Sequence, residues 1–331
     1  MIATEFLEGQ GLGNQLWVYA ACRSIADELG MPHKIFHQEK FKGHSFVDID
    51  CGSCNTSSTK NEEELIGGLS LFNEEMFFDP DMGYFSSDFD QRVLRLKPNT
   101  KIHGLFQSEK YFFGDPSRAK KYIKLKPKYL ATQLVDNNVC VINIRGGEYK
   151  RHKKLILPQS YWINAMRNMT ELYGVKDFIA VSDDDRYVKA LLPGVQILKG
   201  NMAEDFLALY QCKFAILSNS SWGYFPVKTG VEKTCVIAPM HWARFSNKYY
   251  RWASPANLYE SWMWQDMQGS LYSYTDCLQS REITIAYYRE HYYVSTTPSV
   301  VMNPGIRGRV PSWLKKPLKK VLSLFFPRHI G

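Results

Sequence analysis

An arginine and two glycines stand at the end of a short apolar run. Residues 139–144 (VCVINI) lead directly into Arg145, Gly146 and Gly147. An apolar run bounded by glycine predicts a buried parallel strand, and open α/β sheets bind ligands beyond the carboxyl ends of such strands. A guanidinium suits a phosphate or carboxylate, and glycines let backbone amides approach the same anion. The spacing predicts an anion site at Arg145, with a surface turn as the alternative.

A second glycine-rich segment lies near the N-terminus. Residues 9–15 (GQGLGNQ) follow the apolar run 2–7 and precede a helical pattern that Gly30 would end. A glycine loop at the start of a helix offers unpaired backbone amides and the positive end of the helix dipole to an anion. The pattern predicts that Gly11 and Gly13 belong to an anion-binding loop, with a tight structural turn as the alternative.

The remaining pattern indicates how these segments are positioned. Short apolar runs alternate with helical patterns, which predicts parallel sheets covered by helices and therefore an α/β protein. Strands are predicted at 139–144, 178–181, 214–217 and 235–238, and helices at 160–172 and 203–212. The basic segment 118–128 resembles a connection between two halves. We expect one half at 1–134, a second at 135–295 and a tail at 296–331.

Five short blocks of the sequence follow one another in an order typical of an enzyme family. They are 11–16 (GLGNQL), 143–149 (NIRGGEY), 157–162 (LPQSYW), 178–184 (FIAVSDD) and 204–223, which ends in NSSWG. Together they resemble the α-1,2-fucosyltransferases of glycosyltransferase family 11, over roughly residues 5–230. The central block departs from the family pattern. Asn143 and Gly146 replace a histidine and a second arginine, and Glu148 replaces an aspartate.

The resemblance implies a GT-B-like fold, with two Rossmann-like halves facing a central cleft. It implies inverting transfer of fucose from GDP-β-L-fucose to the 2-hydroxyl of galactose. The acceptor would be a cell-surface glycan or its lipid-linked precursor, bound by the half at 1–134, and the half at 135–295 would bind the donor. The altered central block leaves two alternatives, a glycosyltransferase with a different nucleotide-sugar donor and a non-catalytic nucleotide- or sugar-binding relative.

Three predicted strand ends would meet in one crevice, because adjacent parallel strands end at the same edge of a sheet. Serine hydroxyls after the strand at 214–217 are expected to bind diphosphate oxygens, and aspartates after the strand at 178–181 to accept hydrogen bonds from guanine or ribose. Helix capping and a polar turn are the alternatives. The expected donor-binding residues are Gly11, Gly13, Asn143, Gly147, Asp183, Asp184, Asn219, Ser220 and Ser221.

The expected catalytic residues are Arg145, Glu148 and Asn14, which would reach across from the first half. Arg145 would hold the leaving diphosphate. Glu148 is a candidate base for the acceptor hydroxyl, with Asp205 among the alternatives, and it is equally a structural partner of Arg145 or a nearby lysine. The basic run 150–154 is interpreted either as a solvated loop or as a mobile lid over the pyrophosphate.

A leaving diphosphate is neutralised either by a metal or by arginine, helix dipole and amides. Arg145 and the glycine loop supply the second set, so we expect no metal and no cofactor besides the GDP-sugar substrate. The Asp-x-Asp spacing at 183–185 is the one that a metal-dependent enzyme would use. Cys51 and Cys54, with two upstream histidines, suggest either zinc or a plain loop.

Composition fits a soluble enzyme of 331 residues with 45% hydrophobic residues. No apolar run reaches the roughly 18 residues of a membrane span, no cleavable signal is evident, and the seven scattered cysteines are typical of reduced thiols. We therefore expect a cytoplasmic protein.

The net charge of +8 is concentrated in the tail, where residues 291–331 contain seven lysines and arginines and no acidic residue. Leucines and aromatics alternate there with lysines at helical spacing, which predicts a basic amphipathic helix that binds the inner membrane surface through 307–328. A helix docked on its own domain is the alternative. No nucleic-acid partner is expected, because no base-reading module is visible.

Overall fold

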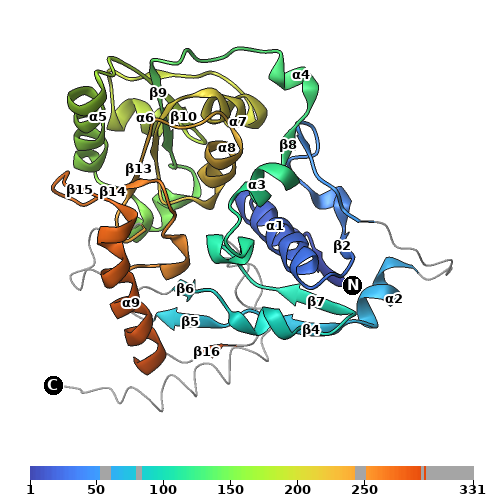
Figure 1. Ribbon diagram of the computed structural model, residues 1–331. Coiled ribbons are helices and arrows are strands. Elements are labelled where there is room, and N and C mark those ends of the chain that lie inside the picture. The colour runs from blue at the N-terminus through green and yellow to red at the C-terminus, as the bar shows by residue number, and fades with distance from the viewer. Residues whose placement is uncertain (53–60, 80–83, 243–250, 292–293, 296–331) are drawn as a thin grey trace. The chain divides into compact units, whose positions relative to one another are not determined.

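Two parallel sheets form the framework of the chain (Figure 1). The first has the order β2-β1-β7-β4 and consists of β1 (Ile2–Glu5), β2 (His33–Phe36), β4 (Ser70–Asn73) and β7 (Thr100–His103). The second has the order β11-β10-β9-β12-β13-β14-β15 and is parallel except for its last pair. Its strands are β9 (Val139–Ile144), β10 (Asp177–Ser182), β11 (Gln196–Ile197), β12 (Phe214–Leu217), β13 (Cys235–Pro239), β14 (Met263–Gln265) and β15 (Leu271–Tyr272).

This computed structural model describes residues 1–52, 61–79, 84–242, 251–291 and 294–295. Two small antiparallel sheets complete the strands: β5 (Met76–Asp79), β6 (Tyr84–Ser87) and β16 (Val294–Ser295) form one, and β3 (Val47–Asp48) and β8 (Lys124–Leu125) form the other. The helices are α1 (Leu12–Glu28), α2 (Glu62–Gly67), α3 (Ser117–Tyr122), α4 (Pro127–Leu130), α5 (Gln159–Tyr173), α6 (Asp185–Leu191), α7 (Met202–Gln211), α8 (Tyr224–Thr229) and α9 (Tyr274–His291). Short 3-10 turns are η1 (Gln38–Lys40), η2 (Gln91–Arg95), η3 (Glu109–Phe112), η4 (Glu148–Arg151), η5 (Lys153–Leu155), η6 (Ser221–Gly223) and η7 (Pro255–Asn257).

The predicted α/β class is confirmed, and so are the elements predicted for the second half. Strands β9 and β12 have the predicted bounds, and α5 and α7 differ from prediction by a residue at each end. Two separate parallel sheets agree with the two Rossmann-like halves that the resemblance implies. The division at residue 134 stays a prediction, since one compact unit extends from Met1 to Pro298. The tail segment 307–328 lies outside the described residues.

Strand β9 contributes side chains to two different cores. Cys140, Ile142 and Ile144 pack with α5 and α6 on one face of the sheet. Val141, on the other face, belongs to a core that contains α7 and α8 and continues into α1 and the first sheet. Alternation along a strand explains this division, because successive side chains point to opposite faces.

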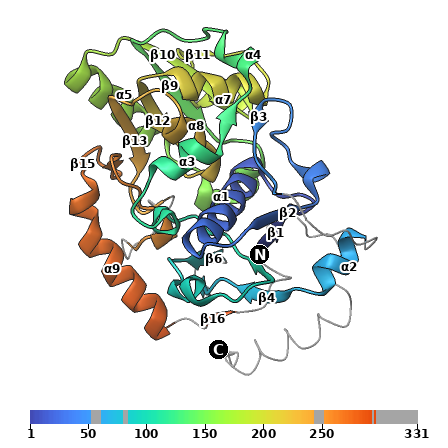
Figure 2. The same cartoon turned by 45° about the vertical axis from the view of Figure 1, so that its right-hand side comes forward.

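Helix α1 is buried around nearly its whole circumference, which the helical pattern before Gly30 did not indicate. Side chains on every face of it are buried, including Trp17, Val18 and Ala21. Trp17 packs against Tyr224 and Tyr259 from the second half of the chain. Figure 2 shows α1 beside β1, β2 and α3. A helix that is apolar all round is typical of a position inside a core.

No helix among the described residues combines the length and the apolar character needed to cross a membrane.

Candidate functional site

The site begins where β9 ends, at Arg145. The Arg145 Nη1 atom lies 2.9 Å from Asp183 Oδ2, and Gly146 N donates to Asp183 Oδ1 at 2.9 Å. Asp183 follows β10, which pairs with β9 in parallel register up to Ser182 and Ile144. The parallel pairing explains the contact, because it brings both strand ends to one edge. A guanidinium and a backbone amide therefore converge on one anion, which here is the Asp183 carboxylate.

The two glycines after Arg145 lie directly against neighbouring side chains. A Cβ at Gly147 would lie 2.4 Å from Asp183 Oδ2, and a Cβ at Gly146 would lie 2.7 Å from the Tyr187 ring. Arg145 also faces the ring of Tyr149, at 5.5 Å from its centroid. The Arg145 Nε atom is buried and has no hydrogen-bond partner among the described residues. The arginine is thus held in place and retains an unused donor.

Asp184 serves the local structure. Its carboxylate accepts from Tyr187 N at 3.0 Å, which caps α6, and it forms an ion pair with Lys150. The hydrogen bond from Lys150, and then the Tyr187 amide, lower the pKa of Asp184. This arrangement agrees with the polar-turn alternative for Asp184, and its contact with a guanine or ribose stays a prediction.

The segment after Arg145 is tied to the loop that follows β12. Tyr149 Oη donates to Asn219 O at 3.1 Å, and Asn219 Nδ2 donates to Leu155 O at 3.0 Å. The basic run 150–154 lies between these two anchors, in η4 and η5. Neither of its two interpretations, solvated loop or lid, included such anchoring. Asn219 is 5% exposed, so its amide joins protein segments in this structure.

Glu148 begins η4 and is exposed. Within the part of the chain that the structure describes, it forms no ion pair with Arg145 or a lysine, since Arg145 pairs with Asp183 and Lys150 with Asp184. The structural partnership expected as an alternative is therefore absent there. An exposed carboxylate three residues beyond Arg145 remains compatible with a base, and that role stays a prediction.

Asn143 lies inside the sheet. Its side chain is 3% exposed, and its Oδ1 accepts from Ser218 Oγ at 3.2 Å. Ser218 N also donates to Asn143 O. These bonds fix the loop after β12 against β9, so Asn143 supports this loop in the structure, and its contact with the donor stays a prediction. Ser220 caps η6 by accepting from Trp222 N at 3.3 Å, in agreement with the capping alternative for this residue.

Asn14 contacts Ser221 of the second half of the chain, and its expected catalytic role stays a prediction. Asn14 Oδ1 accepts from Ser221 Oγ at 2.7 Å and from Gln107 Nε2 at 2.8 Å. Gly13 makes this approach possible, because a Cβ there would lie 2.5 Å from Trp222 N. Nothing lies within 4 Å of the Cβ position of Gly11. Through Gly13 and Asn14, the N-terminal glycine loop therefore contacts the serine loop that follows β12.

Asp205 on α7 is the most perturbed carboxyl group in this region. Burial, and then the nearby charges of Asp185, Glu204 and Asp183, raise the pKa of Asp205 to about 7. Perturbed carboxyl groups are frequent at functional sites. The apolar positions around Asp205 in the sequence place it on a helix, but its proximity to Asp183 depends on the sheet and could not be read from the pattern.

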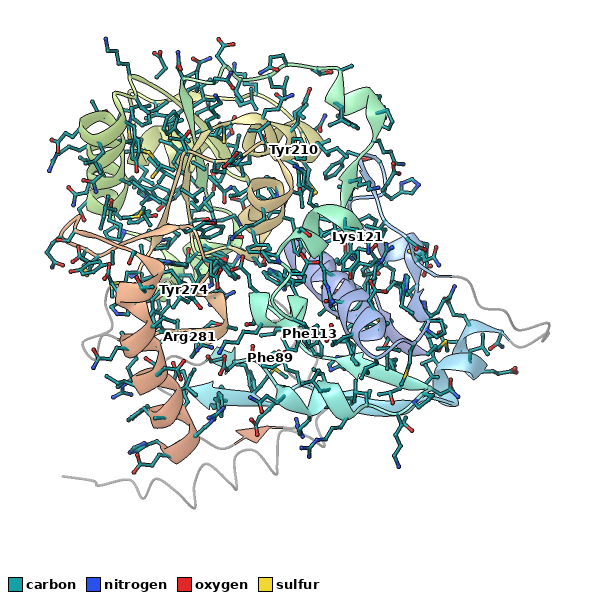
Figure 3. The ribbon with its side chains drawn as sticks, in the orientation of Figure 1. Phe89, Phe113, Lys121, Tyr210, Tyr274 and Arg281 are labelled. Atoms are coloured by element: carbon teal, nitrogen blue, oxygen red, sulfur yellow. The ribbon has the colours of Figure 1, made fainter. Side chains whose placement is uncertain are left out.

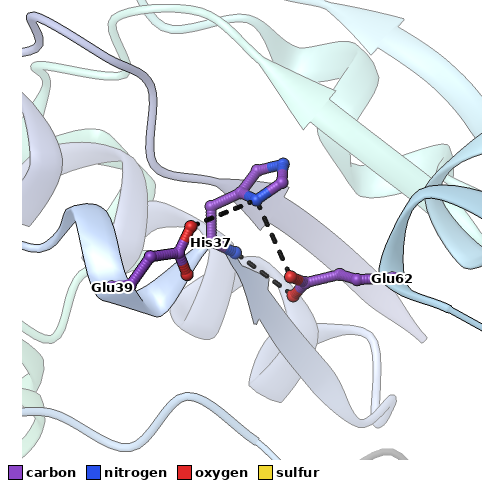
Figure 4. Close-up of side chains that lie close together, drawn as sticks. All are labelled: His37, Glu39 and Glu62. Atoms are coloured by element: carbon purple, nitrogen blue, oxygen red, sulfur yellow. Dashed lines mark hydrogen bonds and ion pairs between the residues drawn. The ribbon is translucent and has the colours of Figure 1, made fainter.

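A separate cluster of potential metal ligands surrounds His37, as Figure 4 shows. Ligand atoms of His37, Glu39 and Glu62 lie within 4.8 Å of one another. His37 also lies 3.6 Å from Glu5 and Glu63. This group gathers carboxylates rather than the expected thiol pair; Cys54 lies outside the described residues. The residues come from the first sheet and its connections, and none of them touches Arg145.

Two residues linked to Asn14 were absent from the sequence-based set. They are Gln107, which bonds to Asn14, and Asn257, which bonds to Gln107. Gln107 follows the end of β7 and Gly104, so the signal of a polar residue after a strand and a glycine was present. Strand β7 (TKIH) is too short and too polar to be recognised from its pattern. Asn257 lies in η7, where no periodic pattern marks it.

Several solved structures are similar to the chain at low identity. A NodZ alpha-1,6-fucosyltransferase soaked with GDP-fucose is 13% identical, with 69% of this chain and 92% of that chain covered and a TM-score of 0.39. The fucosyltransferase NodZ from Bradyrhizobium is 14% identical, with 68% and 91% covered and a TM-score of 0.41. POFUT1 in complex with GDP-fucose is 11% identical, with 72% and 97% covered and a TM-score of 0.44. No curated protein sequence matches the chain.

The family model described as glycosyl transferase family 11 matches residues 85–264. This segment contains four of the five sequence blocks, including Arg145, Asp183 and Ser221, and only the block around Asn14 lies before it. The match covers more than half of the 331 residues and confirms the resemblance seen in the sequence. The chain therefore belongs to glycosyltransferase family 11.

Proposed function

We propose that this glycosyltransferase transfers fucose from GDP-β-L-fucose to the 2-hydroxyl of a galactose residue, with inversion at the anomeric carbon. One observation carries the proposal. The guanidinium of Arg145 and the amide of Gly146 already converge on an anion, Asp183. The bond to the leaving GDP breaks as the acceptor oxygen attacks, so negative charge grows on the diphosphate, and donors aimed at that charge stabilise the transition state.

The neighbouring segments support the same assignment of roles. Asn14 and Ser221 place two polar side chains and the start of α1 together. Helix starts favour anions because their first amides are unpaired. The diphosphate would lie between this contact and Arg145, and the acceptor galactose would approach from the first half of the chain.

We propose that the transfer requires no metal ion. Of the two carboxylates of the Asp-x-Asp spacing, that of Asp183 already pairs with Arg145. Arg145 would supply the positive charge that a divalent cation supplies in metal-dependent enzymes. In the membrane-bound setting that the tail predicts, the acceptor would be a lipid-linked glycan at the inner membrane surface.

A thermal-shift titration tests the donor. Wild-type protein and Arg145→Ala are titrated with GDP, GDP-fucose, GDP-mannose and UDP, with and without EDTA. Ligand that binds only the folded state raises the melting temperature by mass action. We expect a GDP-selective shift that disappears in Arg145→Ala and is unaffected by EDTA. Arg186→Ala, an exposed arginine at the start of α6, is the matched control for loss of one positive charge.

Product analysis with galactose-terminated acceptors tests the transfer itself. Release of GDP coupled to formation of an α-1,2-linked fucose supports the proposal. A UDP-selective shift would assign another donor, as the departures at Asn143 and Gly146 allow. Nucleotide binding without turnover on any acceptor would assign a non-catalytic relative.

A further inference from the structure

A chain of three side-chain amides runs from η7 to the start of α1. Asn257 Nδ2 donates to Gln107 Oε1 at 3.1 Å, and Gln107 Nε2 donates to Asn14 Oδ1 at 2.8 Å. Asn257 is 1% exposed and Gln107 is 8% exposed. The two links join segments 150 and 93 residues apart in the sequence.

The orientation of the Asn257 amide sets the direction of these hydrogen bonds. In the structure its Nδ2 faces Gln107 Oε1, the Gln107 backbone carbonyl oxygen and Tyr259 Oη, and its Oδ1 has no partner among the described residues. Asn257 Nδ2 lies 3.4 Å from the backbone carbonyl oxygen of Gln107. A carbonyl oxygen only accepts, so the atom of Asn257 that faces it must be the amide nitrogen. The same nitrogen then requires the oxygen of the Gln107 side chain. The Gln107 nitrogen consequently faces Asn14, and Asn14 must turn its oxygen toward Gln107.

The segments that carry Asn257 and Gln107 are both held by buried charged side chains. Arg281, labelled on α9 in Figure 3, donates from Nε to Pro255 O at 2.9 Å and so holds η7, and it is 3% exposed. Glu74, fully buried, accepts from Leu105 N at 2.7 Å and from Phe106 N at 2.9 Å, which holds the loop that carries Gln107. Two side chains from outside the chain of amides therefore fix its position.

Asn14 Oδ1 accepts from both Gln107 and Ser221, so the Asn14 oxygen is fully used. The amide nitrogen Nδ2 has no partner among the described residues, and it belongs to the first turn of α1. The first helical bond of α1 runs from Gln15 N to Gly11 O, so the amides before Gln15 point outward from the helix start. Two side-chain hydrogens and the helix start together favour a phosphate oxygen.

We propose that Gln107 and Asn257 are positioning residues that turn the Asn14 amide so that its Nδ2 hydrogens face a phosphate oxygen of the nucleotide-sugar donor. The inference rests on the proposed function, in which a GDP-sugar is the donor. It assigns Gln107 and Asn257 a role through Asn14, without contact with the substrate.

A double-mutant cycle on GDP affinity tests this role. Asn14→Ala, Gln107→Met and the double variant are compared with wild type by calorimetric titration with GDP. We expect each single variant to weaken GDP binding about tenfold, as for a hydrogen bond to a charged group. The double variant should bind as weakly as Asn14→Ala alone, because Gln107 acts only through Asn14. If the losses of GDP affinity in the two single variants instead add up in the double variant, the proposal is overturned and Gln107 is a purely structural residue.

Two further variants separate positioning from folding. Asn14→Asp keeps an oxygen for Gln107 and Ser221 but removes the Nδ2 hydrogens, so it should fold normally and still lose GDP affinity. Gln15→Leu is the matched control, because Gln15 is also a buried glutamine of the first half but bonds only to the backbone of Lys40 and Lys42. It should retain GDP affinity. An Asn14→Asp variant with wild-type GDP affinity would overturn the proposal.

The same cycle, measured as the free energy of unfolding without nucleotide, reports the Gln107–Asn14 contact itself. Coupling in unfolding without coupling in GDP binding would also overturn the positioning role. If the wild-type protein binds UDP rather than GDP, the proposed donor fails, and the cycle is then measured with UDP, where coupling supports the positioning role and its absence overturns it. If the wild type binds neither, the proposed function and the positioning role both fail.

Discussion

At the scale of single residues, the partner of Arg145 decides how the site functions. Asp183 binds the Nη1 atom of the guanidinium and the Gly146 amide in the structure. A diphosphate that binds these same donors must displace the Asp183 carboxylate or share the donors with it. The observed contact thus identifies the donors of the anion site and also a competitor for them.

The variant Asp183→Asn tests this competition. The asparagine oxygen can still accept from Gly146 N, but the negative charge beside Arg145 is gone. We expect the dissociation constant for GDP to fall roughly threefold to tenfold, as for removal of a repulsive charge near a bound anion. Calorimetric titration measures it. Asp177→Asn, at an exposed aspartate at the opposite end of β10, is the control and should change the affinity little. Weaker GDP binding by Asp183→Asn would show that Asp183 mainly orients Arg145.

Asp205 gives a pH-dependent prediction. Burial and the surrounding acids raise its pKa to about 7 in the folded state, above the ordinary value of 3.8. Between these values the folded protein holds a proton that the unfolded chain has lost, so Asp205 decreases stability as the pH rises from about 4 to about 7. Asp205→Asn should therefore gain roughly 1–2 kcal/mol in free energy of unfolding at pH 8 relative to wild type, after allowance for partial exposure.

Urea unfolding of both proteins at pH 4.5 and pH 8 measures this gain. The difference between them should be small at pH 4.5, where Asp205 is protonated in the folded state. An equal difference at both pH values would contradict the raised pKa and assign the effect to packing.

At the scale of elements, the contact between α1 and η6 depends on Gly13. The Cβ of an alanine there would lie 2.5 Å from Trp222 N and 2.6 Å from Ser221 C, and backbone atoms yield less readily than the ends of flexible side chains. We expect Gly13→Ala to lose about 2 kcal/mol or more of stability and to weaken GDP binding, because Asn14 would separate from Ser221. Chemical unfolding and GDP titration measure the two effects.

Gly11→Ala is the matched control for this element. Gly11 adopts an extended conformation with φ −70°, and its Cβ position is open. The substitution should change stability by less than about 0.5 kcal/mol. Similar losses in both variants would show that the glycine loop needs flexibility rather than close approach to η6.

At the scale of the whole molecule, we expect the body and the tail to have separate roles. The body from Met1 to Pro298 contains a core that extends from α1 and the first sheet to α7 and α8. The tail carries nearly all the net charge. Catalysis on a water-soluble acceptor should therefore depend on the body, and access to a lipid-linked acceptor on the tail.

Charge reversal in the full-length chain tests the tail. Each lysine near an anionic membrane contributes about 1 kcal/mol. Lys315, Lys316, Lys319 and Lys320 changed together to glutamate should abolish cosedimentation with anionic vesicles and leave transfer to a soluble galactoside unchanged. Undiminished vesicle binding would assign membrane contact to another surface, and loss of soluble activity would support a tail that docks on its own domain.

The sequence alone determined the local features of this protein. Short apolar runs located β9 and β12, and the glycines after 139–144 placed Arg145 at a strand end. The same patterns do not reveal β2, β4 and β7, because strands of four residues with mixed polarity show no clear hydrophobic periodicity.

Only the tertiary structure decided which residues meet. It joined Arg145 to Asp183 rather than to Glu148, and it joined Asn14 to Ser221 across 207 positions of the chain. Periodicity reports which face of one element is buried, and carries no information on which distant element covers that face. The partners depend on the order of strands in the sheet and on close approaches such as that of Gly13 to η6. These follow from packing the whole chain.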